Sequence, residues 1–238
     1  MIAILAATWD EIRLIRNEIK VAAQGSKGDL SFLAGDLANK SIVAAETGVG
    51  IRRARAGASF IIQKFKPSLI ISAGLGGALN PELKVGDVVV GEKSLSLKKN
   101  ETHDLYIDFS LSKENYKKGL ILSENRFINR AYDKKELAAE SNAIVVDMET
   151  WGIVDAALQS ETPVASIRVV SDEASDELPD MGAIYNSSGE FDFIKSDKYF
   201  KENPELIVPY LKFRFKNTPA ASEALCIFLK SLILGKFN

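Results

Sequence analysis

Two acidic clusters, each directly following a short apolar run, constrain the fold of this chain more than any other feature. The first run, 143–146, leads into Asp147-Met-Glu149, and the second, 164–170, leads into Ser171-Asp172. The residues between them, from Thr150 to Pro163, read as one helix. A strand, a helix and a second strand in this order predict a parallel unit with both clusters at strand exits, where open sheets hold their ligands. One carboxylate can accept hydrogen bonds from sugar hydroxyls, and a second carboxyl group, kept protonated, can give a proton to a leaving group. Together these two roles indicate cleavage of an N-glycosidic bond.

The length and charge of the chain narrow the class of protein. At 238 residues, with 46% hydrophobic content, the chain can bury one sizeable core. Its net charge of −2 argues against a nucleic-acid-binding surface, which normally needs a clustered basic patch. We therefore expect an acidic globular protein that binds no nucleic acid.

Cysteine and histidine are nearly absent, which removes two kinds of site. Cys226 is the sole cysteine, so no internal disulfide can form and a reducing compartment is favoured. His103 is the sole histidine, so a histidine cluster for zinc is excluded. Residues 1–7 read as a strand rather than a signal peptide, and no apolar run reaches the roughly 18 residues of a membrane span. We expect a cytoplasmic protein without a metal site or other cofactor.

Short apolar runs alternate with helical patterns along most of the chain. We expect strands at 1–7, 30–37, 41–46, 68–73, 87–92, 119–123, 143–146 and 164–170. We expect helices at 9–20, 51–66, from about 129 and at 150–163, a Gly-rich loop at 74–78, a polar segment at 173–189, and helices in the remainder. The alternation predicts an α/β fold, three-layer α/β/α with a mixed central sheet. No linker is evident, so we expect one domain over 1–238, with 191–238 as a helical tail packed on it.

Seven short motifs lie at or just past the expected strand ends. They are Ala7-Thr-Trp-Asp-Glu11, Thr47-Gly-Val-Gly50, Ser72-Ala-Gly-Leu-Gly-Gly77, Leu83-Lys-Val-Gly-Asp87, Gly119-Leu-Ile-Leu-Ser123 with Phe127-Ile-Asn129, Val146-Asp-Met-Glu149 and Arg168-Val-Val-Ser-Asp172. In this order they resemble the purine nucleoside phosphorylase/nucleosidase superfamily, most closely its hydrolases acting on methylthioadenosine and S-adenosylhomocysteine. The resemblance covers Met1 to about Leu178. It implies a nucleoside-phosphorylase-like fold and a small nucleoside substrate, and we expect a homodimer.

The resemblance assigns three residues to the reaction. Glu11 activates the attacking water, Asp172 protonates N7 of the leaving purine, and Arg168 helps to position the water or the ribose. Departure of the purine leaves a ribosyl oxocarbenium ion, so water on the opposite face of the sugar gives inversion. Asp172 must then be kept protonated by burial or by a hydrogen bond.

The resemblance assigns five further residues to substrate binding, and the backbone freedom of glycine adds Gly74 as a sixth. Phe127 and Ile128 contact adenine, and Met148 with Glu149 holds the ribose. Ser171 orients the acidic side chain that follows it. Gly74 belongs to a turn that allows close backbone approach to the ligand.

Each of the charged residues could instead have a purely structural role. Glu11 stands three residues after Thr8, the spacing of a helix capping box. Glu149 suits the first turn of a helix, and Asp172 suits a cap. Arg168 lies inside an apolar strand, where a structural ion pair, with Glu149 as a candidate partner, is the alternative to a catalytic role.

The nucleophile is either water or phosphate. The phosphorylases that the chain resembles carry a phosphate-binding arginine two residues before the glycine turn, where this chain has Ser72. Arg52, Arg53 and Arg55 stand at a helix start, which is a candidate anion site, but helix-surface arginines are the simpler interpretation. With a glutamate at position 11, we predict hydrolysis, and phosphorolysis is the alternative. A nucleoside-binding protein without turnover is disfavoured because all three carboxylates are present.

The identity of the 5′ substituent is open. Leu75 stands where hydrolases of methylthioadenosine usually have a small hydroxyl residue, and 174–179 also departs from them. The longer segment 189–217 resembles the branch that removes adenine from adenosylhopane in hopanoid synthesis. Its interleaved aromatic and cationic residues predict that 191–216 lines the 5′ side of the pocket and makes weak contact with a membrane surface. A lid, an oligomer contact or a helix with lysines reaching to water is the alternative.

Overall fold

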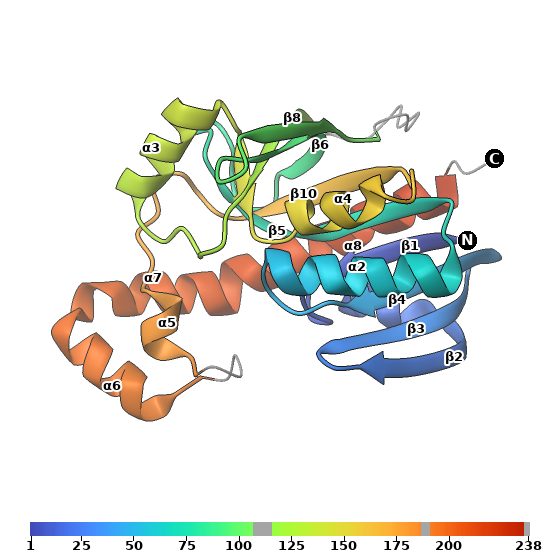
Figure 1. Ribbon diagram of the computed structural model, residues 1–238. Coiled ribbons are helices and arrows are strands. Elements are labelled where there is room, and N and C mark those ends of the chain that lie inside the picture. Colours follow the sequence, from blue (N-terminus) through green and yellow to red (C-terminus); the bar gives the residue numbers. More distant parts are fainter. Residues whose placement is uncertain (107–115, 187–190, 236–238) are drawn as a thin grey trace.

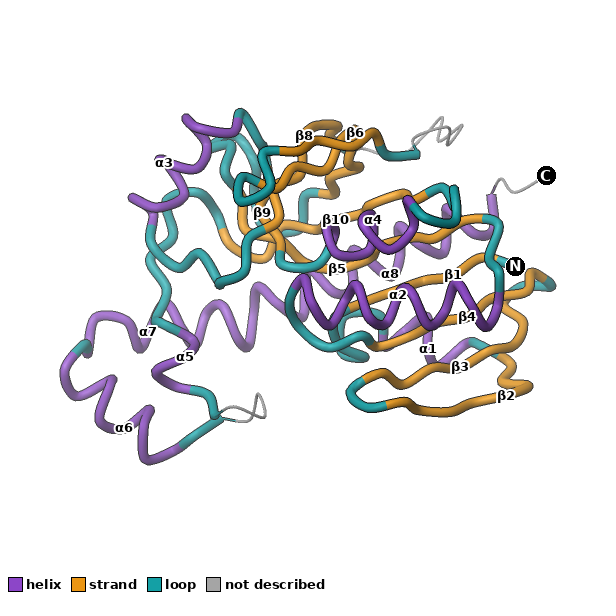
Figure 2. The backbone as a smooth tube through the Cα atoms, in the orientation of Figure 1, coloured by secondary structure: helices purple, strands orange, loops and turns teal. Residues whose placement is uncertain are grey.

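The computed structural model describes residues 1–106, 116–186 and 191–235, and within these the chain builds a ten-stranded mixed sheet with helices around it (Figures 1 and 2). The strands are β1 (Ile2–Ala6), β2 (Lys20–Lys27), β3 (Leu30–Leu37), β4 (Lys40–Glu46), β5 (Leu69–Ala78), β6 (Val88–Ser96), β7 (Glu101–Asp104), β8 (Lys117–Ser123), β9 (Val145–Asp147) and β10 (Val164–Asp172). The helices are α1 (Arg13–Glu18), α2 (Ile51–Phe65), α3 (Ala131–Ser141), α4 (Thr150–Leu158), α5 (Met181–Ile184), α6 (Phe193–Glu202), α7 (Ile207–Lys212) and α8 (Thr218–Gly235), with short 3₁₀ and π turns at Pro204–Leu206 and Phe213–Asn217. The end of the expected polar segment, 187–189, residue 190 and the last three residues of the expected tail lie outside the described residues.

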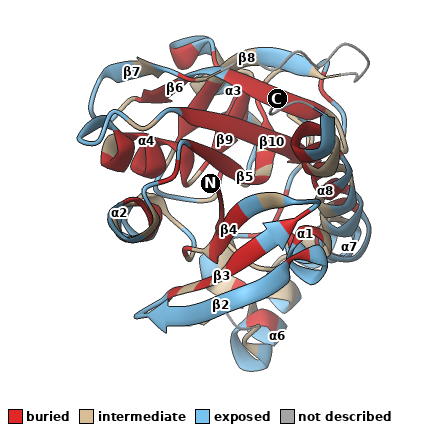
Figure 3. Ribbon diagram, turned by 90° about the vertical axis from the view of Figure 1, so that its right-hand side faces the viewer, coloured by how far each residue is buried: buried red, intermediate tan, exposed pale blue. Residues whose placement is uncertain are grey.

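Helices cover both faces of the sheet, so the expected three-layer arrangement is confirmed. One core cluster joins α1 and α8 to residues of β1, β5 and β10, and a second joins α2 and α4 to the other face. Figure 3 shows the buried inner strands between these helices. Alternating apolar residues of the strands supply both clusters, because successive side chains point to opposite faces of a sheet.

The sheet closes on itself at one end. Its order is β10-β6-β8-β9-β5-β1-β4-β3-β2, and β10 also pairs with β5, so five strands form a ring. β5 pairs in parallel with β1 through Leu69–Ser72, and its last residues, Gly77 and Ala78, pair with β9 instead. The candidate residues gather at this change of neighbours.

The direction of β9 differs from the expectation of a parallel unit. β10 runs parallel to β5, whereas β9 runs antiparallel to it. Gly77 pairs both with Val146 of β9 and with Asp172 of β10. The two acidic clusters therefore meet at Gly77 from opposite directions instead of lying side by side at one edge. Short apolar runs do not encode strand direction, because direction depends on which distant strand supplies the hydrogen bonds.

The expected Gly-rich loop at 74–78 is part of β5. Its residues pair with β10 and β9, so the strand continues through the glycines. At Gly76 a Cβ atom would lie 3.0 Å from the carbonyl oxygen of Val146. The glycine here permits close approach of two strands rather than a turn.

The helix expected at 9–20 is only six residues long. The chain between Thr8 and Ile12 forms turns, and β2 begins at Lys20. All eight side chains of β2 are exposed, so no alternation of apolar residues marks this strand in the sequence. β7 was not predicted for a similar reason, since its four residues are polar or charged.

The helices after β10 divide into a packed part and a projecting part. α8 buries Ala221, Leu225, Cys226, Phe228, Leu229, Leu232 and Ile233. Residues 181–186 and 191–217, here called the arm, project away from the sheet (Figure 1).

By length and composition alone, the continuous helical stretch Pro204–Gly235 could cross a membrane, with a mean hydropathy of 1.3 in its most apolar window. This differs from the expectation that no run is long enough. Because α8 belongs to the core cluster, packing against the sheet accounts for much of its apolar character.

Candidate active site

The ends of β1, β5, β9 and β10 surround one pocket, to which the arm also contributes. The cavity has a volume of about 340 Å³, which is in the range of small-molecule sites. Seven of the expected residues line it: Glu11, Phe127, Ile128, Met148, Glu149, Ser171 and Asp172. Arg168 and Gly74 do not line it. Within the described residues, no group of three or more His, Cys, Asp or Glu side chains could hold a metal ion.

Glu11 faces the pocket from the turn after β1. Its Oε2 accepts a hydrogen bond from Thr8 N at 3.0 Å, and its Oε1 accepts one from Leu75 N at 3.1 Å. The first bond is the one expected of a capping box, although α1 begins only at Arg13. Burial raises the pKa of the Glu11 carboxyl group, and the Thr8 and Leu75 N–H groups partly oppose this shift. A raised pKa makes the group a better proton acceptor once it is ionised.

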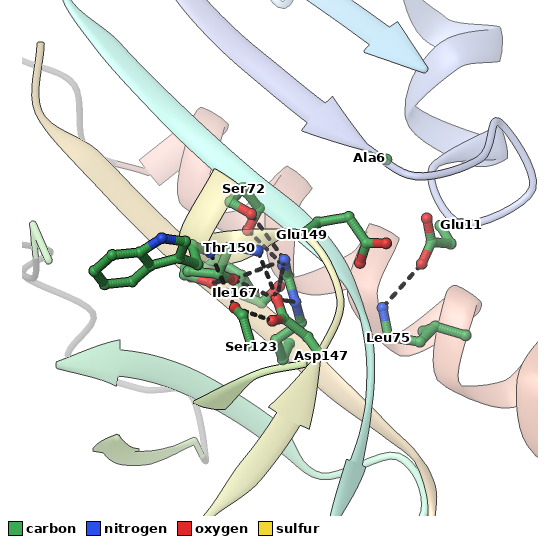
Figure 4. Close-up of polar contacts among 12 residues, drawn as sticks. Ala6, Glu11, Ser72, Leu75, Ser123, Asp147, Glu149, Thr150 and Ile167 are labelled. Atoms are coloured by element: carbon green, nitrogen blue, oxygen red, sulfur yellow. Dashed lines mark hydrogen bonds and ion pairs between the residues drawn. The ribbon is translucent and has the colours of Figure 1, made fainter. Parts of the chain in front are cut away.

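Glu149 lies opposite Glu11, and Figure 4 shows the two carboxyl groups facing each other. The Oε1 of Glu149 accepts a hydrogen bond from Gly50 N at 2.8 Å, at the beginning of α2 rather than in its own helix. Burial raises the pKa of Glu149 to about 8, and the negative charges of Asp147 and Glu11 contribute to the shift. Within the described residues its second oxygen accepts no hydrogen bond, and because Glu149 lines the pocket a ligand hydroxyl can reach it.

Asp172 ends β10 and is fully buried at the pocket wall. Ser171 Oγ donates to its Oδ1 at 2.7 Å, which fits the expected orienting role. Its Oδ2 lies 2.5 Å from the Nζ of Lys134, a residue that the sequence had not marked. Asp172 caps no helix, since turns follow it.

Arg168 lies behind the pocket, not in it. Its guanidinium group is buried, and its Nε donates to Asp147 Oδ2 at 2.7 Å. Its remaining N–H groups donate to Ser72, Thr150 and the carbonyl of Ile167 (Figure 4). The partner of its ion pair is therefore Asp147 rather than Glu149. The positive charge of Arg168 acts on Glu11 and Glu149 from a distance, where it opposes part of the rise in pKa that burial causes.

Gly74 also lies behind the pocket wall. A Cβ atom at this position would lie 3.0 Å from Glu11 Oε1 and 3.7 Å from Arg168 Cζ. The glycine thus makes room for two charged side chains, and no ligand contact is needed to explain it.

Apolar side chains form the remaining walls. Phe127 and Ile128 follow β8 on one side, and Met148 precedes α4. The arm adds Met181, Tyr185, Phe213 and Arg214, and Thr218 lines the pocket at the start of α8. The rings of Phe127 and Phe213 lie 5.8 Å apart, so the arm meets the expected adenine contact directly.

Two residues of this region were missed from the sequence. One is Asp147, which ends β9, the strand that precedes β10 in the chain; a buried arginine requires an acidic partner, and Asp147 is that partner. Lys134 shares a helix face with Leu137, Ala138 and Ser141, at the 3, 4 and 7 spacing of a buried stripe. This spacing is the signal that could have identified a buried lysine.

The ion pair behind the pocket leads to a first prediction. Arg168→Met leaves the Asp147 carboxylate buried without its cation, so we expect the free energy of unfolding to fall by about 3–5 kcal/mol. Urea denaturation monitored by circular dichroism measures this change. The double variant Arg168→Met/Asp147→Asn removes both charges and should lose less than the single variant. A larger loss in the double variant would contradict this account of the pair.

The titration of Glu149 leads to a second prediction. Its pKa is about 8 in the folded protein and near 4.5 in an unfolded chain. Between these values the folded state holds a proton that the unfolded state has lost, so stability falls as pH rises from 4.5 to 8, by up to about 1.4 kcal/mol per pH unit. Glu149→Gln removes this contribution. We expect unfolding free energies at pH 5, 7 and 9 to decline less steeply in the variant, and parallel curves would show that Glu149 does not titrate in this range.

Comparison with known proteins identifies the family of this chain. The sequence model of the family described as "Phosphorylase superfamily" matches residues 1–192. A 5′-methylthioadenosine/S-adenosylhomocysteine nucleosidase of Staphylococcus aureus (strain MRSA252) is 27% identical over 201 residues, covering 74% of this chain and 88% of that protein.

Solved structures resemble the whole chain. A crystal structure of 5′-methylthioadenosine/S-adenosylhomocysteine nucleosidase from Neisseria meningitidis, in complex with methylthio-immucillin-A, has a TM-score of 0.71 and 25% identity, and covers 97% of this chain and 99% of its own. The native structure of futalosine hydrolase of Helicobacter pylori strain 26695 has a TM-score of 0.74 at 20% identity, with 98% and 96% covered, and this likeness shows the fold alone. Because the family model matches most of the chain, the protein belongs to the Phosphorylase superfamily.

Proposed function

We propose that this protein is an N-ribosyl hydrolase that releases adenine from a 5′-substituted adenosine of the methylthioadenosine or S-adenosylhomocysteine type. The observation that carries the proposal is the presence of three carboxyl groups, from Glu11, Glu149 and Asp172, around one largely apolar pocket. The nucleosidase names of the Staphylococcus and Neisseria relatives support the same activity.

The chemistry requires an acid at the base and a base at the sugar. As the C1′–N9 bond breaks, its electron pair goes to the purine, and N7 takes a proton from the Asp172 side. Water attacks C1′ from the opposite face and gives a proton to Glu11, whose raised pKa suits this acceptor role. The sugar is released with inverted configuration.

The remaining pocket residues bind the two halves of the nucleoside. Glu149 accepts hydrogen bonds from the two ribose hydroxyl groups, and Met148 lies against the sugar. Phe127 offers its ring to the adenine, and Ile128 adds an apolar wall. The buried pocket thus combines stacking for the base with hydrogen bonds for the sugar.

Water fits this pocket better than phosphate. Ser72, at the position of a phosphate-binding arginine in similar phosphorylases, is fully buried and accepts a hydrogen bond from Arg168. Arg53 and Arg55 form surface ion pairs with Asp29 and Asp155. The test is release of adenine from 5′-methylthioadenosine with and without phosphate. Release that requires phosphate, with a sugar 1-phosphate as product, would replace hydrolysis by phosphorolysis.

The arm favours a second candidate substrate, an adenosine with a long apolar 5′ group such as adenosylhopane. Phe213 and Arg214 line the pocket, and Phe193, Ile194 and Phe215 of the arm are 79%, 85% and 71% exposed. A panel of 5′-substituted adenosines, with methylthio, homocysteine and long alkyl groups, scored for adenine release, separates the candidates. A strong preference for methylthioadenosine would exclude the lipid substrate.

The exposed apolar side chains of the arm also support two proposed contacts. One is pairing of two copies as a homodimer, and the other is weak binding to a membrane surface through aromatic residues with neighbouring lysines. Sedimentation with and without anionic liposomes distinguishes them, since a dimer forms without lipid. A cytoplasmic location and a part in purine salvage complete the proposal, and cell fractionation tests the location.

A further inference from the structure

Lys134 is a lysine with no exposed surface, near the N-terminal end of α3. Its Nζ lies 2.5 Å from Asp172 Oδ2 and 2.7 Å from the backbone oxygen of Glu173. Both side chains of the Lys134–Asp172 ion pair are 0% exposed. Burial of two charges costs several kcal/mol per ion before their attraction offsets it, so a buried pair at a pocket wall calls for an explanation.

Asp172 stands between the ammonium group and the pocket. Asp172 lines the cavity, whereas Lys134 does not. Of the two carboxylate oxygens, Oδ1 accepts from Ser171 Oγ and Oδ2 accepts from Lys134 Nζ. The lysine can therefore act on a ligand only through the carboxyl group of Asp172.

The pair changes the source of the proton for the leaving base. In this ion pair the Asp172 oxygen is the acceptor and the Lys134 ammonium group is the donor, so the hydrogen between the two groups belongs to the lysine. The proton that the two groups share is then carried by the lysine nitrogen. Asp172 therefore takes part in the reaction as one member of an ion pair and not as an isolated carboxylic acid.

We propose that Lys134 supplies, through Asp172, the proton that the leaving purine takes up. This inference rests on the proposed hydrolase function. As the C1′–N9 electron pair moves to the purine, a proton passes from Nζ to the Asp172 carboxyl group, and a proton passes from that group to N7. Lys134 is left as a neutral amine beside a carboxylate. It regains a proton from solvent through Asp172 after the base departs, while Glu11 returns the proton taken from water.

The test compares leaving groups that differ in their need for a proton. 5′-Methylthioadenosine needs protonation of the base, whereas the matching 5′-methylthioriboside of 4-nitrophenol loses a stable anion and does not. We expect Lys134→Met to lower kcat/KM for the adenosine by about 10²-fold or more, the usual range for general acid catalysis, and to change that for the nitrophenyl riboside by less than about threefold. Lys135→Met, at the exposed neighbouring lysine, should leave both unchanged.

A double variant removes the remaining ambiguity. If the two residues act as one proton-donating unit, Lys134→Met/Asp172→Asn loses no more on the adenosine than Asp172→Asn alone, because such units are non-additive. Equal losses on both substrates, or losses that add in the double variant, would show a structural ion pair and overturn the proposal. Lys134→Gln, which keeps a hydrogen-bond donor without the charge, serves the same comparison if the methionine variant does not fold.

The wild-type assay separates this inference from the proposed function. If the wild-type protein releases no adenine and cleaves no nitrophenyl riboside, the hydrolase function fails and the role of Lys134 fails with it. If the wild type hydrolyses both substrates and Lys134→Met affects them equally, only the role of Lys134 is lost.

Discussion

Glu11→Gln is expected to lower kcat for adenine release by about 10²–10⁴-fold, the contribution of a positioned general base. The carboxamide cannot take a proton from water, although it occupies the same space. Affinity for adenine should change little, because water activation is a role of the transition state. Steady-state kinetics with 5′-methylthioadenosine and calorimetric titration with adenine measure the two effects.

A contribution to folding must be separated from this effect. Both carboxylate oxygens of Glu11 accept backbone N–H groups, from Thr8 and Leu75, so the variant turns one acceptor into a donor. Some loss of stability, about 1–3 kcal/mol, is therefore expected as well. Asp10→Asn, at the exposed neighbouring acid, is the matched control. If Glu11→Gln melts earlier but turns over normally, the residue is a turn-stabilising cap and not the base.

Asp172→Asn is expected to reduce kcat on 5′-methylthioadenosine by a similar factor, about 10²–10⁴-fold. The amide oxygen still accepts a hydrogen bond from Ser171, but the amide cannot pass a proton to N7. Because the variant also leaves the buried Lys134 ammonium group without its carboxylate, a loss of stability is expected as well. Single-turnover kinetics of adenine release measure the chemical step directly.

An acid outside the pocket serves as the control for Asp172. Asp197→Asn removes a carboxylate that is 63% exposed and paired with Lys201, and it should leave turnover unchanged. Wild-type rates in Asp172→Asn would exclude the residue from leaving-group protonation, and the role of Lys134 would fall at the same time.

The strand ends were predictable from the sequence, and the way they meet was not. Apolar runs before Glu11, Asp147 and Asp172 located the expected site residues at strand exits, because a buried strand reads as a continuous apolar segment. The antiparallel pairing of β9 with β5 had no such signal. It depends on hydrogen bonds between residues about 70 positions apart, such as Gly77 with Val146.

Arg168 was predictable as a paired charge, but its partner was not, and Lys134 was not singled out from the sequence. Arg168 stood out inside an apolar strand, and Lys134 stands on the inner stripe of its helix. Each requires an acidic neighbour, yet the sequence offers several acids at similar distances along the chain. Only the fold selects Asp147 for the arginine and Asp172 for the lysine.

The π-helical turn Phe213–Asn217 joins the arm to α8 and carries two of the pocket residues, Phe213 and Arg214. A π turn holds one residue more than an α turn, so deletion of one residue here would restore a continuous α-helix. Because a π turn takes up its extra residue locally, the helices on either side would keep nearly the same orientation, and the change would fall on the side chains of the turn itself, Phe213 and Arg214. The carboxyl groups of Glu11, Glu149 and Asp172 belong to other elements and would stay in place. Insertions and deletions in this one turn can therefore change which ligands the pocket accepts during evolution, while the residues that carry out the reaction stay in place.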